Sequence, residues 1–277
     1  MSTTTAAGVL RPSRSERTAT LRKNLVLVRE IAWTQFKLKY TGSVLGYLWS
    51  LLKPAAYFGV LYVIFVKLIK FRADEFPLQL LVGIVLFTFF TECTNVGLGS
   101  IVGNGGLIQK AYFPRAILVV ASSMTAAMTF VINFVLIVAI ATPLGHLHLG
   151  LRTLAVVPLV LELYVLSLGL SLLLSSLFVF YRDLGHIWEI LGQVIFYASA
   201  VVFPIAIVPV SLRAVFFSNP LAQIIEDVRH ALVVSDIPST FSLIGAVALV
   251  PIGISLGLFV VGALVFRTLS PSFAENL

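Results

Sequence analysis

Charged residues are scarce in this sequence. Asp, Glu, Lys and Arg account for 11% of the 277 residues, whereas 59% of the residues are hydrophobic. A soluble globular protein of this length needs more polar residues to cover its surface. The scarcity therefore excludes a soluble domain and indicates an integral membrane protein. The net charge of +7 does not indicate nucleic-acid binding, because the cations flank apolar segments, where they contact lipid headgroups.

Cysteine and the common catalytic motifs are nearly absent as well. Cys93 is the single cysteine, which excludes an intrachain disulfide and a multi-cysteine metal site. The sequence has no GxxxxGK[ST] loop for ATP and no HExxH, GxSxG or paired-aspartate motif. His146 and His148 lie close together without a carboxylate cluster nearby, which argues against a zinc site. We therefore expect no enzymatic activity and no metal or cofactor on this chain.

The N-terminal region divides into two parts. Residues 1–20 are rich in Ser, Thr and Arg without an apolar core, which predicts a disordered cytosolic tail and no cleavable signal peptide. In residues 21–41, apolar side chains repeat with helical spacing and charged side chains fall on the opposite side. This pattern predicts an amphipathic helix lying on the inner leaflet. Its apolar stripe contains Leu21, Leu25, Val28, Ala32 and Phe36.

Six apolar stretches follow, each reaching the ~20 residues that a membrane-spanning helix requires. Lysines and arginines are concentrated in one set of the connecting loops, which predicts that both termini are cytoplasmic. We expect an all-α membrane protein with a transmembrane domain over residues 42–270 and a cytosolic tail over residues 271–277. The expected spans cover residues 44–69, 78–101, 116–141, 154–180, 186–208 and 241–266.

The linker between the fifth and sixth spans is apolar but interrupted by prolines, and each piece is too short to cross a bilayer. Broken helices at membrane depth need cover from protein or a water-filled cavity. We predict a re-entrant helical hairpin at the outer mouth of a pathway, with an amphipathic cap lying flat on the leaflet as the alternative. Along it runs an apolar stripe, Leu221, Ile224, Ile225, Val228 and Leu232, with Glu226, Asp227 and Arg229 off the stripe.

Residues 37–54, KLKYTGSVLGYLWSLLKP, join the amphipathic helix to the first span. Lys37, Lys39 and Lys53 can extend their ammonium groups toward phosphates at the bilayer surface. Gly42 and Gly46 keep the backbone between them bendable. In the second span, Glu92 either lines a wet path or forms a hydrogen bond with a neighbouring helix.

Aromatic residues are concentrated in spans one, two and five, including Trp188 and Phe196. Aromatic faces stack on the C–H faces of sugar rings, so such a lining would let a glycan slide without one deep binding site. Packing against lipid or neighbouring helices is the alternative for each residue. The aromatics that we expect along a glycan path are Tyr47, Trp49, Tyr57, Phe58, Tyr62, Phe87, Phe90, Tyr197 and Phe203.

Several short landmarks follow one another in a specific order. After LGYLW come LIQKAYFPR before the third span and YRDLGH before the fifth, then FPIAIVP, NPLAQIIEDVRHAL and SPSFAENL. This order resembles the ABC-2 type transmembrane subunits that export polysaccharides, namely the Wzm-type O-antigen and galactan exporters and the related teichoic-acid exporter permease. The resemblance extends from about residue 21 to the end of the sequence.

The resemblance implies a homodimer in the bacterial inner membrane, assembled with two copies of a separate ATPase that binds ATP and Mg²⁺. It implies that Leu45 and Gly46 receive the pyrophosphate end of a polyprenyl-diphosphate-linked glycan, and that the hairpin shapes the exit. Two inner loops would contact the ATPase, although simple turns would also explain their composition. The coupling residues implied are Leu107, Ile108, Gln109, Lys110, Tyr112, Phe113, Arg115, Tyr181, Arg182 and Asp183.

Our hypothesis is that the lysines of residues 37–54 attract the lipid pyrophosphate while the glycan threads an aromatic channel between two subunits. Closing of the partner ATPases then pushes on residues 107–115 and re-aims the first span. Two alternatives stay open. One is an ABC-2 exporter of drugs or free lipids, and the other is a stand-alone carrier or scramblase.

Overall fold

The computed structural model describes residues 14–70, 75–110, 113–143, 145, 147, 150–202, 208–233 and 237–277. Their regular structure is helical, apart from one isolated bridge between Leu147 and Val233. The helices are α1 (Arg14–Tyr40), α2 (Leu48–Tyr62, continued as a π-helix over Val63–Leu68), α3 (Phe76–Gly99), α4 (Gly105–Lys110), α5 (Ala116–Ala141), α6 (Val156–Phe178), α7 (Leu184–Ala198), α8 (Arg213–Phe216), α9 (Pro220–Leu232), α10 (Thr240–Ile244), α11 (Leu249–Leu269) and α12 (Phe273–Asn276).

Five helical segments of the described chain are long and apolar enough to cross a membrane. They confirm the first, second, third, fourth and sixth expected spans. The expected third span, residues 116–141, has the same bounds as α5. The five segments are Leu48–Leu68, Phe76–Gly99, Ala116–Ala141, Leu151–Phe180 and Thr240–Asn276.

The expected fifth span corresponds to α7, which has only 15 residues. At about 1.5 Å per residue it is shorter than the ~30 Å hydrocarbon core. The helix ends at Ala198, and Ala200 has a left-handed backbone with φ of 56°, which breaks the helical path. The sixth crossing therefore stays a prediction.

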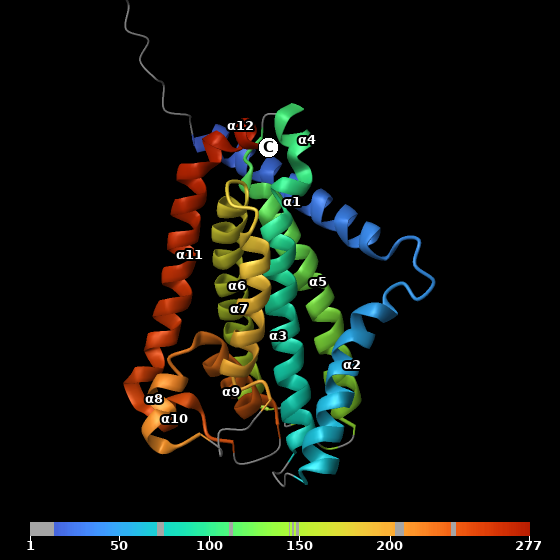
Figure 1. Cartoon of the computed structure of the whole chain (residues 1–277), viewed down its shortest axis with the longest axis vertical. Helices are drawn as coiled ribbons and strands as arrows, with labels where there is room; N and C mark the ends of the chain where they lie inside the picture. Colours follow the sequence, from blue (N-terminus) through green and yellow to red (C-terminus); the bar gives the residue numbers. More distant parts are fainter. Residues whose placement is uncertain are drawn as a thin grey trace, which may run out of the picture.

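Long helices form an upright bundle, and α1 together with several short helices lies at its two ends (Figure 1). We call them the α4 end, which carries α1, α4 and α12, and the α9 end, which carries α8, α9 and α10. Helix α3 packs against α5 and α6, and α6 packs against α11. Gly262 makes the last contact possible, because a Cβ on it would lie 2.1 Å from the carbonyl oxygen of Gly169.

Helix α1 differs from the sequence prediction in its start and in its surroundings. It begins at Arg14, so residues 14–20 are helical although we expected them in a disordered tail. No glycine or proline interrupts the chain between Pro12 and Gly42, so the helix can continue toward the N-terminus without a break. Val28 and Ala32 pack on Ile117 and Ala121 of α5, so protein covers this part of the apolar stripe. Leu21 and Leu25, by contrast, are exposed.

The expected C-terminal tail is folded onto the α4 end. Residues 271–277 include α12, and the Phe273 side chain is completely buried. It packs in one cluster with Ile101, Ile108 and Phe266. The last residues are therefore part of the bundle, because burial of the Phe273 ring among apolar side chains stabilises the folded tail.

Helix α9 is buried on both of its faces, which corrects the prediction of a polar side. Its apolar stripe packs in the main core, but Glu226 and Arg229 are also buried, at 1% and 0% exposure. With both charges buried, α9 does not lie flat with its charged side toward water. The chain instead wraps α9 with α3, α6 and α11. The prediction of a flat amphipathic cap is therefore wrong for α9. The re-entrant hairpin stays a prediction, and its residues 203–207 and 234–236 lie outside the described residues.

Candidate functional site: a polar groove between α2, α3 and α7

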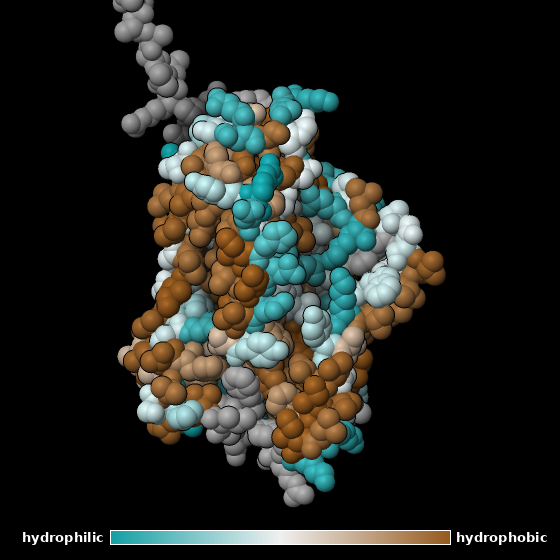
Figure 2. All heavy atoms as spheres, in the orientation of Figure 1, coloured by the Kyte–Doolittle hydropathy of each residue, from teal (hydrophilic) through white to brown (hydrophobic). Residues whose placement is uncertain are grey.

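A groove of about 1130 Å³ opens on one face of the bundle. Figure 2 shows the same face, where hydrophilic side chains run down the middle between apolar flanks. Its walls come from the end of α1, the following turn, α2, α3 and α7. The lining residues are Lys39, Ser43, Gly46, Trp49, Ser50, Lys53, Tyr57, Ile84, Phe87, Thr88, Thr91, Glu92, Asn95, Val96, Gly185, Trp188, Glu189, Gly192, Gln193, Phe196 and Tyr197.

The α7 wall has strict helical spacing. Its lining positions 185, 188, 189, 192, 193, 196 and 197 follow steps of three and four residues, which is one face of a helix. The face combines small, aromatic and polar residues, among them Gln193 and Glu189. The other face of α7 is apolar and exposed, including Ile190 and Val194. This division predicts that α7 turns one side to lipid or protein and the other to a wet groove.

The α3 wall places polar groups in a helix that is otherwise buried. Thr88 and Thr91 donate their hydroxyls to the carbonyl oxygens of Ile84 and Phe87, at 2.7 and 3.0 Å, so part of their hydrogen-bonding capacity is satisfied within the helix. Glu92 lies one position farther along and faces the groove with Asn95. Several polar side chains inside one membrane span are stable only where water, a ligand or protein, rather than lipid, faces them.

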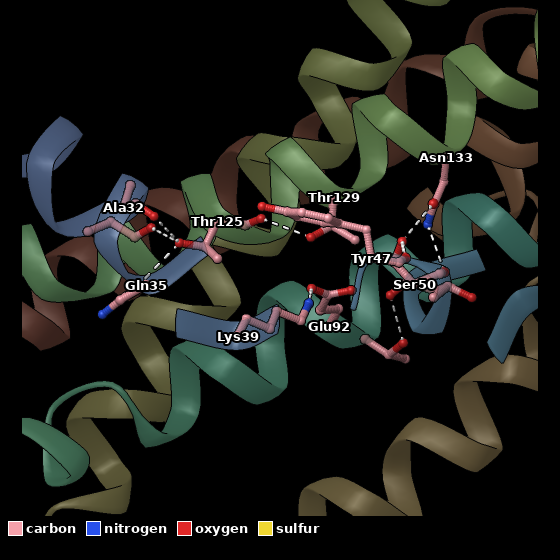
Figure 3. Close-up of polar contacts among 12 residues, drawn as sticks. Ala32, Gln35, Lys39, Tyr47, Ser50, Glu92, Thr125, Thr129 and Asn133 are labelled. Carbon is pink, nitrogen blue, oxygen red and sulfur yellow. Dashed lines mark hydrogen bonds and ion pairs between the residues drawn. The ribbon is translucent and has the colours of Figure 1, made fainter. Parts of the chain in front are cut away.

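Lys39 and Glu92 form an ion pair at the end of α1 (Figure 3). The pair joins the last turn of α1 to the second half of α3. Both side chains are partly exposed, at 35% for Lys39 and 21% for Glu92. The sequence suggested that Glu92 either lines a wet path or bonds to a neighbouring helix. The structure supports both interpretations, since the carboxylate lines the groove and also contacts Lys39 of α1. The pair joins residues far apart in sequence at the boundary of the groove.

The turn between α1 and α2 has the bend that the sequence predicted. Gly42 and Gly46 have φ of 82° and 47°, a left-handed conformation that side chains rarely adopt. Beyond the turn, Ser50 fixes the start of α2 to α5. Its hydroxyl donates to Asn133 Oδ1 at 3.3 Å, and Asn133 Nδ2 donates to the Ser50 carbonyl oxygen at 3.1 Å. Figure 3 shows these contacts beside the Lys39 ion pair.

The predicted gate residues separate into two groups. Lys39, Gly46 and Lys53 line the groove together, whereas Gly42 and Leu45 are in the turn but not in the lining. Lys37 is also absent from the lining, and its Nζ lies 5.2 Å from the ring centre of Trp33. A cation over an aromatic face is stabilised where it is. The structure therefore gives Lys37 a different setting from the other two lysines.

The predicted aromatic path is also only partly assembled. Trp49, Tyr57, Phe87 and Tyr197 line the groove, joined by Trp188 and Phe196. The remaining predicted aromatics pack elsewhere: Tyr47 contacts Phe36, Phe58 contacts Tyr62, and Phe90 is buried against Phe87 and Trp188. Phe203 lies outside the described residues. The sequence analysis did not single out Asn95 and Gln193, although the spacing along α7 could have indicated Gln193.

The two predicted coupling segments meet at the α4 end. Ile108 is buried in the cluster around Phe273, whereas Leu107 on α4 and Tyr181 after α6 are exposed. Phe273 contacts Phe180 at 6.3 Å between ring centres, and the Arg115 guanidinium lies 5.9 Å from the Phe273 ring. The remaining predicted members occupy the same end, with Arg182 over the Phe178 ring, Gln109 and Lys110 on α4, Phe113 before α5, and Asp183 before α7; Tyr112 lies outside the described residues.

At the α9 end, Arg229 holds three elements together from a fully buried position. Its Nε donates to the carbonyl oxygen of Gln79 at 2.9 Å and its Nη2 to that of Val201 at 3.0 Å. Its Nη1 lies 3.3 Å from Glu226 Oε2. Burial raises the pKa of the Glu226 carboxyl above its ordinary value. Arg229 thus connects α9, the start of α3 and the segment after α7.

The fold and the groove define a helical membrane protein with a polar path beside its spans, and comparison with known proteins gives its family. The family described as ABC-2 type transporter matches residues 26–233, and the chain belongs to this family. It is similar to the O-antigen export system permease protein RfbA of Klebsiella pneumoniae, with 26% identity over 190 residues, 68% of this chain and 73% of the relative. It is also similar to RfbA of Myxococcus xanthus, with 24% identity over 91% of this chain and 95% of the relative. The polysialic acid transport protein KpsM of Escherichia coli is 24% identical over 84% of this chain and 92% of that protein. The chain is therefore a multi-pass permease subunit.

Proposed function

We propose that this chain is the membrane subunit of an ATP-driven exporter that moves a polyprenyl-diphosphate-linked polysaccharide out of the cytosol. The observation that carries the proposal is the groove, which combines two lysines with six aromatic rings. A lysine ammonium binds phosphate oxygens by charge-assisted hydrogen bonds. Aromatic faces stack on sugar rings. The names of the O-antigen and polysialic-acid relatives support a glycan as the transported molecule.

The same groove supports a homodimer. Glu189 and Gln193 face an opening on the side of the bundle, where lipid would offer these polar groups no partners. A second copy placed against this face would cover them and close a pathway between the two subunits. In this arrangement α7 belongs to the remaining crossing, which gives six spans. The hairpin that contains α9 then lies at the outer mouth, fixed by Arg229.

We place the ATPase at the α4 end and this end in the cytoplasm of a bacterial inner membrane. Leu107 and Tyr181 are exposed there, and both are anchored to neighbours of one buried ring, Phe273. A push on either segment would therefore reach α11 through the same cluster. ATP and Mg²⁺ would bind to the partner chain, since this sequence has no P-loop.

The test compares two lysines of the first span in the assembled complex. Lys53 lines the groove, whereas Lys67 lies near the other end of the segment, 5.9 Å from the ring centre of Tyr62. Lys53→Gln should lower glycan export and ATPase stimulation by lipid-linked glycan roughly tenfold, because a hydrogen bond to a charged group is removed. Lys67→Gln should change neither. Equal effects of the two variants, or no effect of Lys53→Gln, would contradict the phosphate role.

An exporter of drugs or free lipids would respond differently. Small amphiphiles would then stimulate the ATPase as well as lipid-linked glycan does, and the aromatic wall would bind them without sugar. A stand-alone carrier would move its substrate in vesicles that contain this chain alone. An apolar drug would offer the two groove lysines no acceptor, whereas a phospholipid would offer its phosphate, so the dependence of ATPase stimulation on the sugar separates a lipid exporter from a glycan exporter.

A further inference from the structure

The Lys39–Glu92 pair lies where the lipid phosphates would enter. Lys39 is the last lysine of α1, and Glu92 belongs to the α3 wall of the groove. Both residues line the groove, so the pair occupies part of the volume that a bound headgroup would need. Each side chain is partly exposed, so a ligand in the groove can reach the ammonium group without unfolding α1.

We propose that Glu92 is a substitute anion for the substrate, and that a diphosphate group displaces it from Lys39. This inference rests on the proposed function and deepens it by naming the residue that sets the threshold for binding. Carboxylate and phosphate oxygens accept the same hydrogen bonds from an ammonium group. A diphosphate carries more negative charge than one carboxylate, so it can take Lys39 from Glu92 where a weaker anion cannot.

The other charges of the groove fit this exchange. Its lining contains two lysines, Lys39 and Lys53, and two glutamates, Glu92 and Glu189, so the formal charges balance before a ligand enters. Glu189 lies on the α7 wall and forms no ion pair with the lysines among the contacts of the described residues. Glu92 is thus the groove carboxylate that is positioned to compete for Lys39. After exchange, its carboxylate would repel the phosphates and promote their later release.

The exchange would also release a tie between helices. While paired, Lys39 connects the end of α1 to α3, just before the turn with left-handed Gly42 and Gly46. Once the diphosphate holds Lys39, the turn and the start of α2 are no longer fixed to α3 through this contact. Substrate binding would in this way be coupled to the position of the first span.

The experiment measures binding of geranylgeranyl diphosphate to the full chain in phosphatidylcholine nanodiscs. Glu92→Gln should bind about 5-fold more tightly than the wild type, since a partly exposed ion pair no longer competes. Glu30→Gln is the control, because it also removes the carboxylate of an ion pair, formed with Arg29 on the exposed surface of α1 and outside the groove; its affinity should change less than twofold. The double variant Lys39→Glu with Glu92→Lys keeps an ion pair between the two positions. It should nevertheless bind the diphosphate more weakly than the wild type, because the lysine then lies on α3.

Two probes identify the part of the ligand that is recognised. Inorganic pyrophosphate should compete with the same dependence on Glu92 but more weakly, which would identify the lipid headgroup as the source of the diphosphate. Geranylgeraniol, which has no phosphate, should show no dependence on Glu92. Equal dependence with geranylgeraniol would overturn the proposal.

The outcome also separates this inference from the proposed function. If Glu92→Gln binds the diphosphate no more tightly than the wild type, while its melting temperature is unchanged, the pair is only structural and the exchange is wrong. Binding that still depends on Lys53 would leave the exporter proposal intact in that case. If the wild type and all variants ignore the diphosphate, both proposals fail together.

Discussion

Helices α2 and α3 form neighbouring walls of the groove, but the chain holds them in different ways. In the most apolar window of each span, 72% of the residues are buried for α3 and only 6% for the segment Leu48–Leu68. Helix α3 is enclosed by α5, α6 and α9, whereas α2 contacts α3 and α5 along one side. One wall is therefore built into the core, and the other leaves most of its surface to lipid or to another subunit.

This difference teaches how a single chain can contain both a fixed and a movable side of a pathway. The fixed wall has close packing and buried hydrogen bonds that resist displacement. The open wall is tied by a few polar contacts, of which Lys39–Glu92 and Ser50–Asn133 are examples. Motion of the first span would consequently cost less than motion of α3.

The strongest test of the fixed wall is Arg229→Met. The arginine donates to the backbone of α3 and faces Glu226 in a fully buried site. Its removal leaves a carboxyl and two carbonyl oxygens without their partner, and should lower the free energy of unfolding by about 3–5 kcal/mol. Unfolding by SDS in mixed micelles measures the loss.

The control is Glu226→Gln, which keeps the shape of the side chain. Because burial raises the pKa of Glu226, a neutral side chain is tolerated there better than the loss of the arginine. Its effect should be less than half that of Arg229→Met. Equal losses would show that the ion pair, rather than the bonds from Arg229 to backbone, fixes α9 to α3.

Replacing one glycine in each wall by alanine should change the free energy of unfolding by a smaller amount, and with opposite sign for the two walls. A Cβ on Gly97 of α3 would lie 2.5 Å from the Cβ of Ser171, whereas a Cβ on Gly59 of α2 meets nothing within 4 Å. Gly97→Ala should destabilise by about 1–3 kcal/mol through overpacking. Gly59→Ala should stabilise by up to ~1 kcal/mol, because alanine is the better helix former. The same unfolding assay checks both, and a loss at Gly59 would mean that a neighbour covers α2.

The sequence was sufficient for features that depend on local composition. The span over residues 116–141 was predicted with the correct bounds, since a mainly apolar stretch without charged residues, flanked by Pro114 and Pro143, leaves little choice. The bend at Gly42 and Gly46 followed in the same way from the conformational freedom of glycine. Both features are set by residues that are close together in the chain.

The sequence was insufficient for features that depend on packing between helices distant in the chain. Arg229 was assigned to a polar face of α9 because helical periodicity shows which residues share a side, but not that other helices cover every side. The Lys39–Glu92 pair joins residues separated by 53 positions, and no local pattern indicates it. Lys37, two residues from Lys39, was assigned the same role, although it lies over Trp33.

The smallest expected effect concerns the tie between the open wall and α5. Asn133→Leu removes both side-chain hydrogen bonds to Ser50 and leaves the rest of α2 unchanged. Interhelical hydrogen bonds in membranes contribute about 0.6 kcal/mol on average, so the loss of stability should be no more than ~1 kcal/mol. The mobility of the helix should nevertheless increase, because few other polar contacts hold it. A spin label at position 57 would report this increase, whereas a label at position 88 on α3 should not change; equal responses at the two positions would mean that both walls move as one body.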